Sequence, residues 1–296
     1  MIYLDHNATT PLDKRVRQEM LKLGDEPLNP SSVHSFGRLG KSLLEKTRRQ
    51  IAKMLNINLK EYRVIFTSGG TEANNLILQN FSSNDEDLKN KIVISNIEHA
   101  SIFEQQSSLP NIELTEVNRA GMADLGKLEQ KLKSRNFKLV SVMLANNETG
   151  AIQPIKDITE VAHKYDAQVH CDATCGAGKI KVDIAELGVD FLTISAHKFG
   201  GPKGVGALVV RADFPLKASL YGGKQEQGLR AGTENVEAIV GFGEAAELAT
   251  LELSSRITHM QNLQQKLEEE LERNFKVKII AKENLRLPNT TLILAE

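Results

Sequence analysis

The chain has 296 residues, of which 41% are hydrophobic and 25% are charged, an ordinary globular composition that allows a large buried core. Its 37 basic residues balance its 38 acidic residues, so neither a nucleic-acid-binding nor a membrane-binding surface is predicted. No apolar run is long enough to span a bilayer, and no signal peptide is recognisable at the N-terminus. The two cysteines, Cys171 and Cys175, are too few for a disulfide framework and favour the reducing cytoplasm.

Taken in chain order, residues 1–12 are predicted to form a short extended arm. Asp13 is a plausible N-cap for the amphipathic helix that follows, and a second helix is predicted over 37–55. From Tyr62 onward, short apolar strands alternate with helical stretches. Strands are predicted at 63–67, 91–95, 112–116, 139–145, 167–172, 190–195 and 206–211, and helices at 71–81, 99–107, 124–134, 155–165 and 182–187.

This alternation predicts an open, mostly parallel sheet with helices on both faces, an α/β fold in which ligands bind beyond the carboxyl ends of the strands. A long helical stretch rich in Glu, Leu and Gln then runs from Glu234 to about Asn274. Two strand-like runs, 276–280 and 290–295, follow it. No metal site is predicted.

The segment from Ser195 to Gly206 joins two of these strands and places Lys198 beside His197 in a glycine-rich turn. A lysine held partly out of water can attack a carbonyl group as a neutral amine, as a Schiff-base lysine must. A solvated lysine in a plain turn is the alternative, and this short motif alone does not exclude it.

Three upstream features favour the reactive lysine. Asp172 closes an apolar strand, where a buried carboxylate needs a cationic partner such as a protonated pyridine nitrogen. The turn 68–71 precedes a helix, whose free N–H groups suit a phosphate. His99 follows another strand, and its imidazole could stack on a flat ring. Each also has a structural alternative, namely a turn aspartate, helix capping and a packed histidine.

Along the chain, the candidate features are a phosphate-binding turn, a stacking imidazole, a carboxylate and a lysine. This order resembles that in the pyridoxal phosphate enzymes of the aspartate aminotransferase fold. Several motifs are more closely similar to the cysteine desulfurases of the NifS/IscS group: Tyr3–Pro11, Asn29–His34, Thr67–Asn75, Asn146–Gly150 and Gly228–Asn235. The resemblance runs from Tyr3 to about Thr290, and the motifs together are highly specific. It implies a fold type I enzyme with an arm (1–12), a large cofactor domain (13–253) and a partial small domain (254–296).

The resemblance also implies roles for individual residues. Lys198 would hold pyridoxal 5′-phosphate as a Schiff base and move the substrate's α-proton, Asp172 would pair with the pyridinium nitrogen, and His99 would stack on the ring and carry protons. Other residues would bind the cofactor phosphate or its phenolic oxygen: Gly70, Thr71, Asn147, Cys175, Ser195, His197 and Thr233. Thr233 would reach the phosphate across a subunit interface, which implies a homodimer.

Two departures from the family pattern stand out. Cys175 occupies the position of a glutamine that donates a hydrogen bond to the cofactor's phenolic oxygen, and a thiol is a weaker donor. The family's persulfide-forming cysteine and substrate-binding arginine lie further along the chain than these 296 residues extend, so a C-terminally truncated chain is expected. Cys171 should point into the sheet, and neither it nor Cys175 is expected to replace the missing nucleophile.

The resemblance therefore predicts a cytoplasmic cysteine desulfurase. It would convert L-cysteine to L-alanine and pass sulfur to an enzyme thiol as a persulfide, for iron–sulfur clusters or thio-modified tRNA, with a scaffold or sulfur-acceptor protein as partner. Two alternatives stay open. One is another class V enzyme, such as a selenocysteine lyase or an aminotransferase, and the other is a truncated protein that binds the cofactor without turnover.

Overall fold

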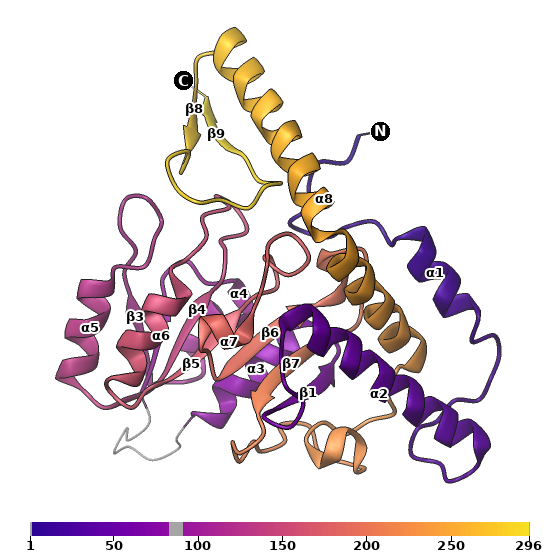
Figure 1. Ribbon diagram of the computed structural model, residues 1–296. Coiled ribbons are helices and arrows are strands. Elements are labelled where there is room, and N and C mark those ends of the chain that lie inside the picture. The colour runs from indigo at the N-terminus through magenta and orange to yellow at the C-terminus, as the bar shows by residue number, and fades with distance from the viewer. Residues whose placement is uncertain (1, 83–90, 296) are drawn as a thin grey trace.

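A seven-stranded sheet forms the centre of the computed structural model, which describes residues 2–82 and 91–295 (Figure 1). The strand order is β1-β7-β6-β5-β4-β2-β3. Strand β7 runs antiparallel to both of its neighbours, and the other pairs are parallel, which confirms the predicted mostly parallel sheet. The strands are β1 (Tyr62–Thr67), β2 (Lys91–Ser95), β3 (Ile112–Thr115), β4 (Phe137–Met143), β5 (Gln168–Asp172), β6 (Phe191–Ser195) and β7 (Gly206–Arg211).

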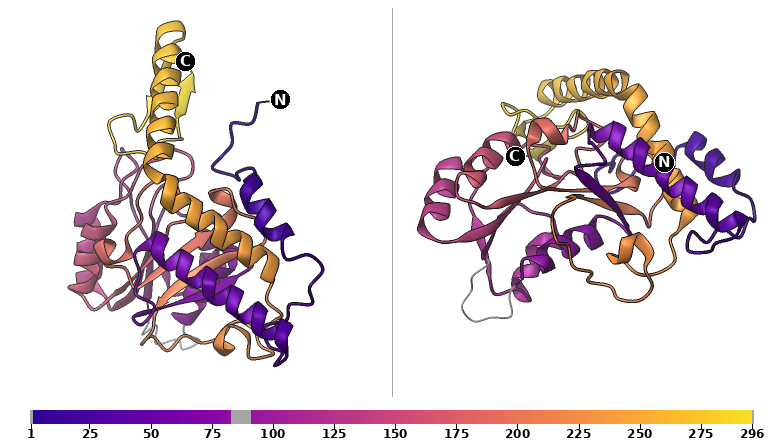
Figure 2. Two further views of the ribbon diagram at one scale, coloured as in Figure 1. Left: turned by 45° about the vertical axis from the view of Figure 1, so that its right-hand side comes forward. Right: turned by 60° about the horizontal axis from the view of Figure 1, so that its bottom comes forward.

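Helices cover both faces of this sheet, as Figure 2 shows. The helices are α1 (Lys14–Leu21), α2 (Ser35–Leu55), α3 (Gly70–Asn80), α4 (Ala100–Phe103), α5 (Leu125–Ser134), α6 (Ile155–His163), α7 (Ile184–Leu187) and α8 (Val236–Asn274), with short 3₁₀ turns η1 (Glu104–Ser107), η2 (Ala196–Lys198) and η3 (Gln225–Gly228). The predicted helix over 99–107 is thus one α-helical turn followed by a 3₁₀ turn.

Alternate side chains along each strand belong to different cores, because successive residues of a strand point to opposite faces. In β1, Val64 and Phe66 pack in the larger core with α2, α5, α6 and α8. Ile65 packs in the smaller core with α3 and α4. Burial on both faces explains why these strands appear in the sequence as continuous apolar runs. The same arrangement brings the start of α3 to the carboxyl ends of the central strands.

The C-terminal part of α8 extends beyond the sheet and carries the hairpin of β8 (Val277–Ile280) and β9 (Leu292–Ala295) beside it (Figure 1). The connection between these strands returns to the large sheet, where the Leu287 N–H donates to the Gly150 carbonyl at 2.8 Å. The predicted domain boundary between residues 253 and 254 falls within α8, which is continuous there. The segment around Leu287 therefore stays in contact with the loop that follows β4.

The N-terminal arm contains no helix or strand from residue 2 to residue 13 and follows the turn after β6. The Thr10 N–H donates to the His197 carbonyl at 2.8 Å, and the Asp13 N–H donates to the Gly200 carbonyl at 2.9 Å. The Asp13 side chain then accepts from the Arg15 N–H and caps α1, as predicted. In the described part of the chain, no helix is both long and apolar enough to cross a bilayer.

Candidate active site

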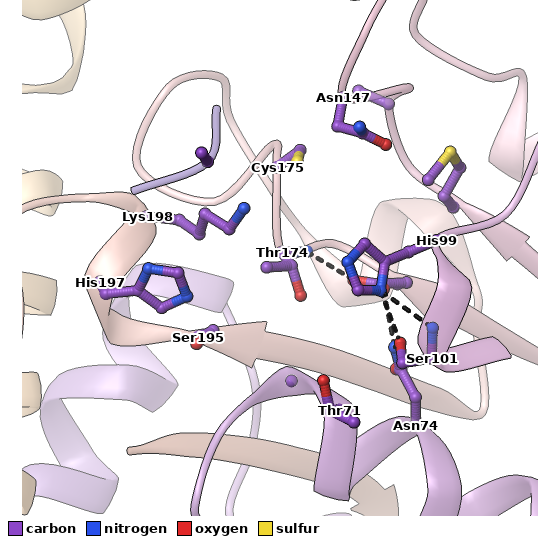
Figure 3. Close-up of a pocket in the computed structure, with 15 residues that line it drawn as sticks. Thr71, Asn74, His99, Ser101, Asn147, Thr174, Cys175, Ser195, His197 and Lys198 are labelled. Atoms are coloured by element: carbon purple, nitrogen blue, oxygen red, sulfur yellow. Dashed lines mark hydrogen bonds between the residues drawn. The ribbon is translucent and has the colours of Figure 1, made fainter. Parts of the chain in front are cut away.

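A cavity of about 180 Å³ lies at the carboxyl ends of β5 and β6, where α3 begins (Figure 3). Every residue that the sequence predicted for the site lines it, with the exception of Thr233. Thr233 lies instead in a separate hollow beside Ser68 and Glu226. The lining residues are Ala8, Gly70, Thr71, Asn74, His99, Ser101, Met143, Ala145, Asn147, Asp172, Thr174, Cys175, Ser195, His197 and Lys198.

Asp172 occupies the last position of β5 and is 6% exposed. Its Oδ1 accepts a hydrogen bond from the Thr174 N–H at 2.9 Å, and its Oδ2 accepts one from Asn74 Nδ2 at 2.8 Å. Asn74 Nδ2 also donates to Ser101 Oγ at 2.9 Å. These donors fix the plane of the carboxylate, yet no lysine or arginine in the described ranges forms an ion pair with it.

Two buried titratable groups near Asp172, His170 and Glu98, carry little charge near neutral pH. Burial lowers the pKa of His170 to about 4, and its ring lies between Ser141 Oγ at 2.9 Å and Thr193 Oγ1 at 3.0 Å. Burial raises the pKa of Glu98 to about 8, so this carboxyl group stays largely protonated at pH 7. Neither group therefore compensates the charge of Asp172, and this charge is available to a cation in the cavity.

One end of the cavity is suited to an anion. Helix α3 begins at Gly70 without a side-chain cap, because Gly69, with φ of +157°, occupies the N-cap position. Free N–H groups at a helix start attract phosphate. The Ser195 and Thr174 hydroxyl oxygens are buried nearby and have no hydrogen-bond partner among the described residues. A Cβ atom at Gly70 would lie 3.1 Å from Thr174 Oγ1, so a side chain here would crowd this end.

His197 completes this end of the cavity. Burial lowers the pKa of its imidazole to about 4, and the positive charges of Lys198 and Lys203 contribute, so the ring is neutral at pH 7. Its Nδ1 lies 3.0 Å from Thr9 Oγ1 in the arm. A neutral imidazole can accept through one nitrogen and donate through the other, so Nε2 is left to face an anion.

Lys198 ends the 3₁₀ turn η2, and its side chain is half-buried. Its Nζ donates a hydrogen bond to the backbone carbonyl of Asn7. The chain turns sharply after it, since Gly200 and Gly204 have φ values of +91° and +78°, a conformation that glycine adopts without strain. The turn places the amine at the mouth of the cavity, near Cys175 (Figure 3).

His99 and Asn147 border the cavity from two other loops. His99 is the N-cap of α4, where its Nδ1 accepts from the Ser101 N–H at 3.1 Å. His99 thus has a structural role as a helix cap, while its ring faces the cavity (Figure 3). Asn147 follows β4, and its backbone carbonyl accepts from Asn7 Nδ2 at 2.8 Å.

Both thiols are buried. Cys171 is fully buried in β5, and burial raises its pKa well above the ordinary value. Cys175 lines the cavity at 7% exposure, and burial raises its pKa as well. Because the thiolate is the nucleophilic form, neither group is suited to attack a substrate sulfur at neutral pH.

Three polar lining residues were missed by the sequence analysis, namely Asn74, Ser101 and Thr174, as were the apolar residues Ala8, Met143 and Ala145. Asn74 was the easiest of them to predict, because it follows Thr71 by three residues and therefore lies on the same face of the helix. Thr174 gave no comparable signal, since a hydroxyl two residues beyond a strand end is common in any turn, and Ser101 lies within the short helix α4.

The cavity fits pyridoxal 5′-phosphate by its own chemistry. It offers an amine for the aldehyde, an uncompensated carboxylate for the ring nitrogen, and unpartnered hydroxyls beside an uncapped helix start for the phosphate. These groups, Lys198, Asp172 and Ser195, come from different elements and converge on one space.

Comparisons with known proteins agree with this chemistry. The family model for aminotransferase class V matches residues 2–294. The chain is 41% identical over 294 residues to the cysteine desulfurase IscS of Dictyoglomus turgidum, covering 97% of this chain and 74% of that protein. It is 38% identical over 333 residues to a selenocysteine lyase of Xenopus tropicalis, covering 98% of this chain and 74% of that protein.

Among solved structures, a NifS-like protein from Rickettsia africae superimposes with a TM-score of 0.95 at 46% identity, covering 99% of this chain and 81% of that one. This match confirms the predicted fold. The chain therefore belongs to the class V aminotransferase family, in its NifS/IscS group, and is a pyridoxal phosphate-dependent enzyme.

Proposed function

We propose that the protein is a cysteine desulfurase, which converts L-cysteine to L-alanine and transfers the sulfur to a thiol as a persulfide. One observation carries this proposal: the amine of Lys198 and the uncompensated carboxylate of Asp172 face the same cavity, beside a helix start that has no side-chain cap. The kinship with IscS and NifS-like proteins supports the choice of substrate.

Pyridoxal phosphate, when bound, withdraws electrons from the Cα atom of an amino acid. The residues of this chain would hold it and handle protons. Lys198 would bind the aldehyde carbon and carry the proton that leaves Cα. Asp172 would keep the ring nitrogen protonated, while its donors Thr174 and Asn74 keep the carboxylate in one orientation.

The remaining predicted residues would orient the bound groups. Thr71, Ser195 and His197 would donate hydrogen bonds to the phosphate, His99 would stack on the ring, and Asn147 would face the substrate carboxylate. We further propose a homodimer in which Thr233 reaches the partner's phosphate. The position of Thr233 outside the cavity of its own chain supports this role.

The sulfur acceptor is proposed to be a thiol other than Cys171 and Cys175, because burial keeps both of these protonated. A sulfur-acceptor or iron–sulfur scaffold protein would take the persulfide, for cluster assembly or tRNA thiolation. The names of the IscS relatives support this use.

A second candidate, selenocysteine lyase activity, is supported by the match to the Xenopus tropicalis enzyme. Release of selenide from L-selenocysteine, measured beside release of sulfide from L-cysteine, separates the two candidates.

The decisive test measures L-alanine and sulfide released from L-cysteine by protein loaded with pyridoxal phosphate, with dithiothreitol present to accept the sulfur. We expect equal amounts of both products and none from Lys198→Ala. A protein that shows lysine-dependent cofactor absorbance near 420 nm but releases neither product would contradict the proposed reaction and leave the cofactor assignment intact.

A further inference from the structure

The wall of the cavity that faces Lys198 is built by the N-terminal arm. Ala8 lines the cavity itself, whereas His6 lines a neighbouring hollow of about 710 Å³ on the other side of the arm. Lys198 borders both spaces. Asn7 therefore stands at the partition between them, at the point where the lysine amine meets the arm.

The side chain of Asn7 is fully used in hydrogen bonding. Its Oδ1 accepts from Lys179 Nζ at 2.9 Å and from Asn289 Nδ2 at 2.9 Å. Its Nδ2 donates to the Asn147 carbonyl at 2.8 Å and to Thr290 Oγ1 at 2.8 Å. An amide can donate twice and accept twice, so this side chain is fixed in one orientation by groups from three distant parts of the chain.

Lys179 is an unusual partner for a neutral amide. It is 4% exposed, and no carboxylate in the described part of the chain forms an ion pair with it. Burial, together with the nearby charge of Lys198, lowers its pKa to about 8. Burying an ammonium group without a counter-ion costs stability, so a fold that keeps one here uses it for something other than stability.

We infer that Asn7 and Lys179 are positioning residues for Lys198. Lys179 holds the Asn7 side chain, and Asn7, so fixed, presents its backbone carbonyl to the Lys198 amine. The amine is thereby kept at the mouth of the cavity, where the aldehyde of the cofactor must arrive. This inference rests on the proposed role of Lys198 in binding the cofactor.

A purely structural role for Asn7 would anchor the arm without affecting the amine. The arm has other anchors, since Thr10 Oγ1 donates to the His197 carbonyl at 2.8 Å and accepts from the Gly200 N–H at 2.8 Å. Those contacts hold the arm to the turn after β6 and stay intact when Asn7 is changed. The loss of Asn7 should therefore displace the carbonyl that meets Lys198 more than the arm as a whole.

The test is the rate at which the cofactor-free full chain captures added pyridoxal phosphate. The rate is followed at 420 nm, and borohydride reduction with peptide mass mapping locates the modified lysine. Misplacing a reacting group by about 1 Å can cost up to about 100-fold in rate, so we expect Asn7→Ala to slow capture about tenfold. Lys179→Met should slow it similarly. In Lys179→Gln, whose side chain has the same length as methionine but keeps an N–H donor, we expect at least a threefold recovery relative to Lys179→Met.

Asn58→Ala is the matched control, because Asn58 bonds to Glu61 on the surface, away from the site. It should capture the cofactor at the wild-type rate. Wild-type rates in Asn7→Ala and Lys179→Met, or equal rates in Lys179→Met and Lys179→Gln, would overturn the inference. If Asn7→Ala proves unfolded by its melting curve, the Lys179 pair decides alone. Labelling that persists in Lys198→Ala would instead contradict the proposed function.

Discussion

Two walls enclose the cavity, and they are built in different ways. The sheet wall consists of strand ends and the start of α3, where Asp172, Ser195 and Thr71 are placed by neighbouring strands and one helix. The arm wall consists of Ala8, beside Asn7, whose side-chain partners come from segments near residues 147, 179 and 290. A regular sheet fixes the first, whereas individual side-chain hydrogen bonds fix the second.

This difference indicates that the two walls have different roles. The sheet wall carries the charge that the proposed chemistry needs, and the positions of its residues are set by backbone pairing. Lys198 forms no ion pair within the described ranges and bonds to the Asn7 carbonyl, so the arm wall is expected to orient the amine. Changes in the sheet wall should therefore alter the reaction most, and changes in the arm wall should alter the approach of the cofactor.

The largest effect is expected from Asp172→Asn. The substitution keeps the size of the side chain but removes the charge that would hold a proton on the ring nitrogen. Loss of such an electrostatic contact in a buried site lowers kcat by about 100-fold or more. Steady-state release of L-alanine measures this, with the surface variant Asp213→Asn as control. If Asp172→Asn retained wild-type turnover, the sheet wall would not carry the chemistry.

The buried carboxyl group of Glu98, close to the sheet wall, should make the stability of the protein depend on pH. Its Oε1 accepts from Ser95 Oγ and, at 2.8 Å, from the Met143 N–H, while its Oε2 is buried without a partner among the described residues. Burial raises its pKa to about 8. Between pH 4.5 and pH 8 the unfolded chain releases this proton and the folded chain retains it, so stability falls as the pH rises.

Glu98→Gln removes this titration and keeps the accepting oxygen. Relative to the wild type, the free energy of unfolding of Glu98→Gln should therefore rise by roughly 2 to 4 kcal/mol between pH 5 and pH 8, since one pKa unit corresponds to about 1.4 kcal/mol. Urea denaturation of cofactor-saturated protein at several pH values measures the difference. Parallel pH profiles for the two proteins would show that Glu98 is ionised in the fold.

Asn74→Ala probes the support of Asp172. The variant removes the donor to Oδ2 and leaves the carboxylate held by the Thr174 N–H alone. A hydrogen bond to a charged group contributes about 1.5 to 3 kcal/mol, so we expect kcat/KM to fall about tenfold or more. Asn75→Ala is the neighbouring control, because Asn75 bonds to the Thr71 carbonyl and does not line the cavity. Similar losses in both variants would indicate damage to α3 and not to Asp172.

The two walls also differ in how far the sequence predicted them. Asp172 and Ser195 are the last residues of strands that the apolar pattern located within two residues, and Lys198 follows Ser195 by three residues, so their convergence followed from the topology. Asn7 was predicted to matter only as a member of the family motif Tyr3–Pro11, and no role was predicted for Lys179. Their contact depends on how the arm and the segment near Thr290 fold back, and no local periodicity encodes that.

Thr233 and Glu98 show two further limits. Thr233 lies outside the cavity of its own chain, so its proposed role depends on a second subunit. Glu98 was not predicted to be buried, because a glutamate between a strand and a helix normally faces solvent. Its Oε1 accepts from the Met143 N–H at the end of β4, a contact between the loop after β2 and a separate strand that the sequence does not reveal.

The smallest effect is expected at Cys175, which lines the cavity between the two walls. Burial raises the pKa of its thiol, so the group stays a weak S–H donor throughout the neutral range. Cys175→Gln would supply a stronger amide donor to the cofactor's phenolic oxygen. Such a donor draws electron density from that oxygen. The oxygen then attracts the proton on the neighbouring Lys198 nitrogen less strongly.

The pH at which the absorbance of the bound cofactor changes should therefore fall in Cys175→Gln, by somewhat less than 1 unit for a hydrogen bond of roughly 1 kcal/mol. Cys175→Ala is the matched control, and its titration should coincide with that of the wild type because only a weak donor is lost. A titration of Cys175→Gln identical to both would place residue 175 out of reach of the phenolic oxygen.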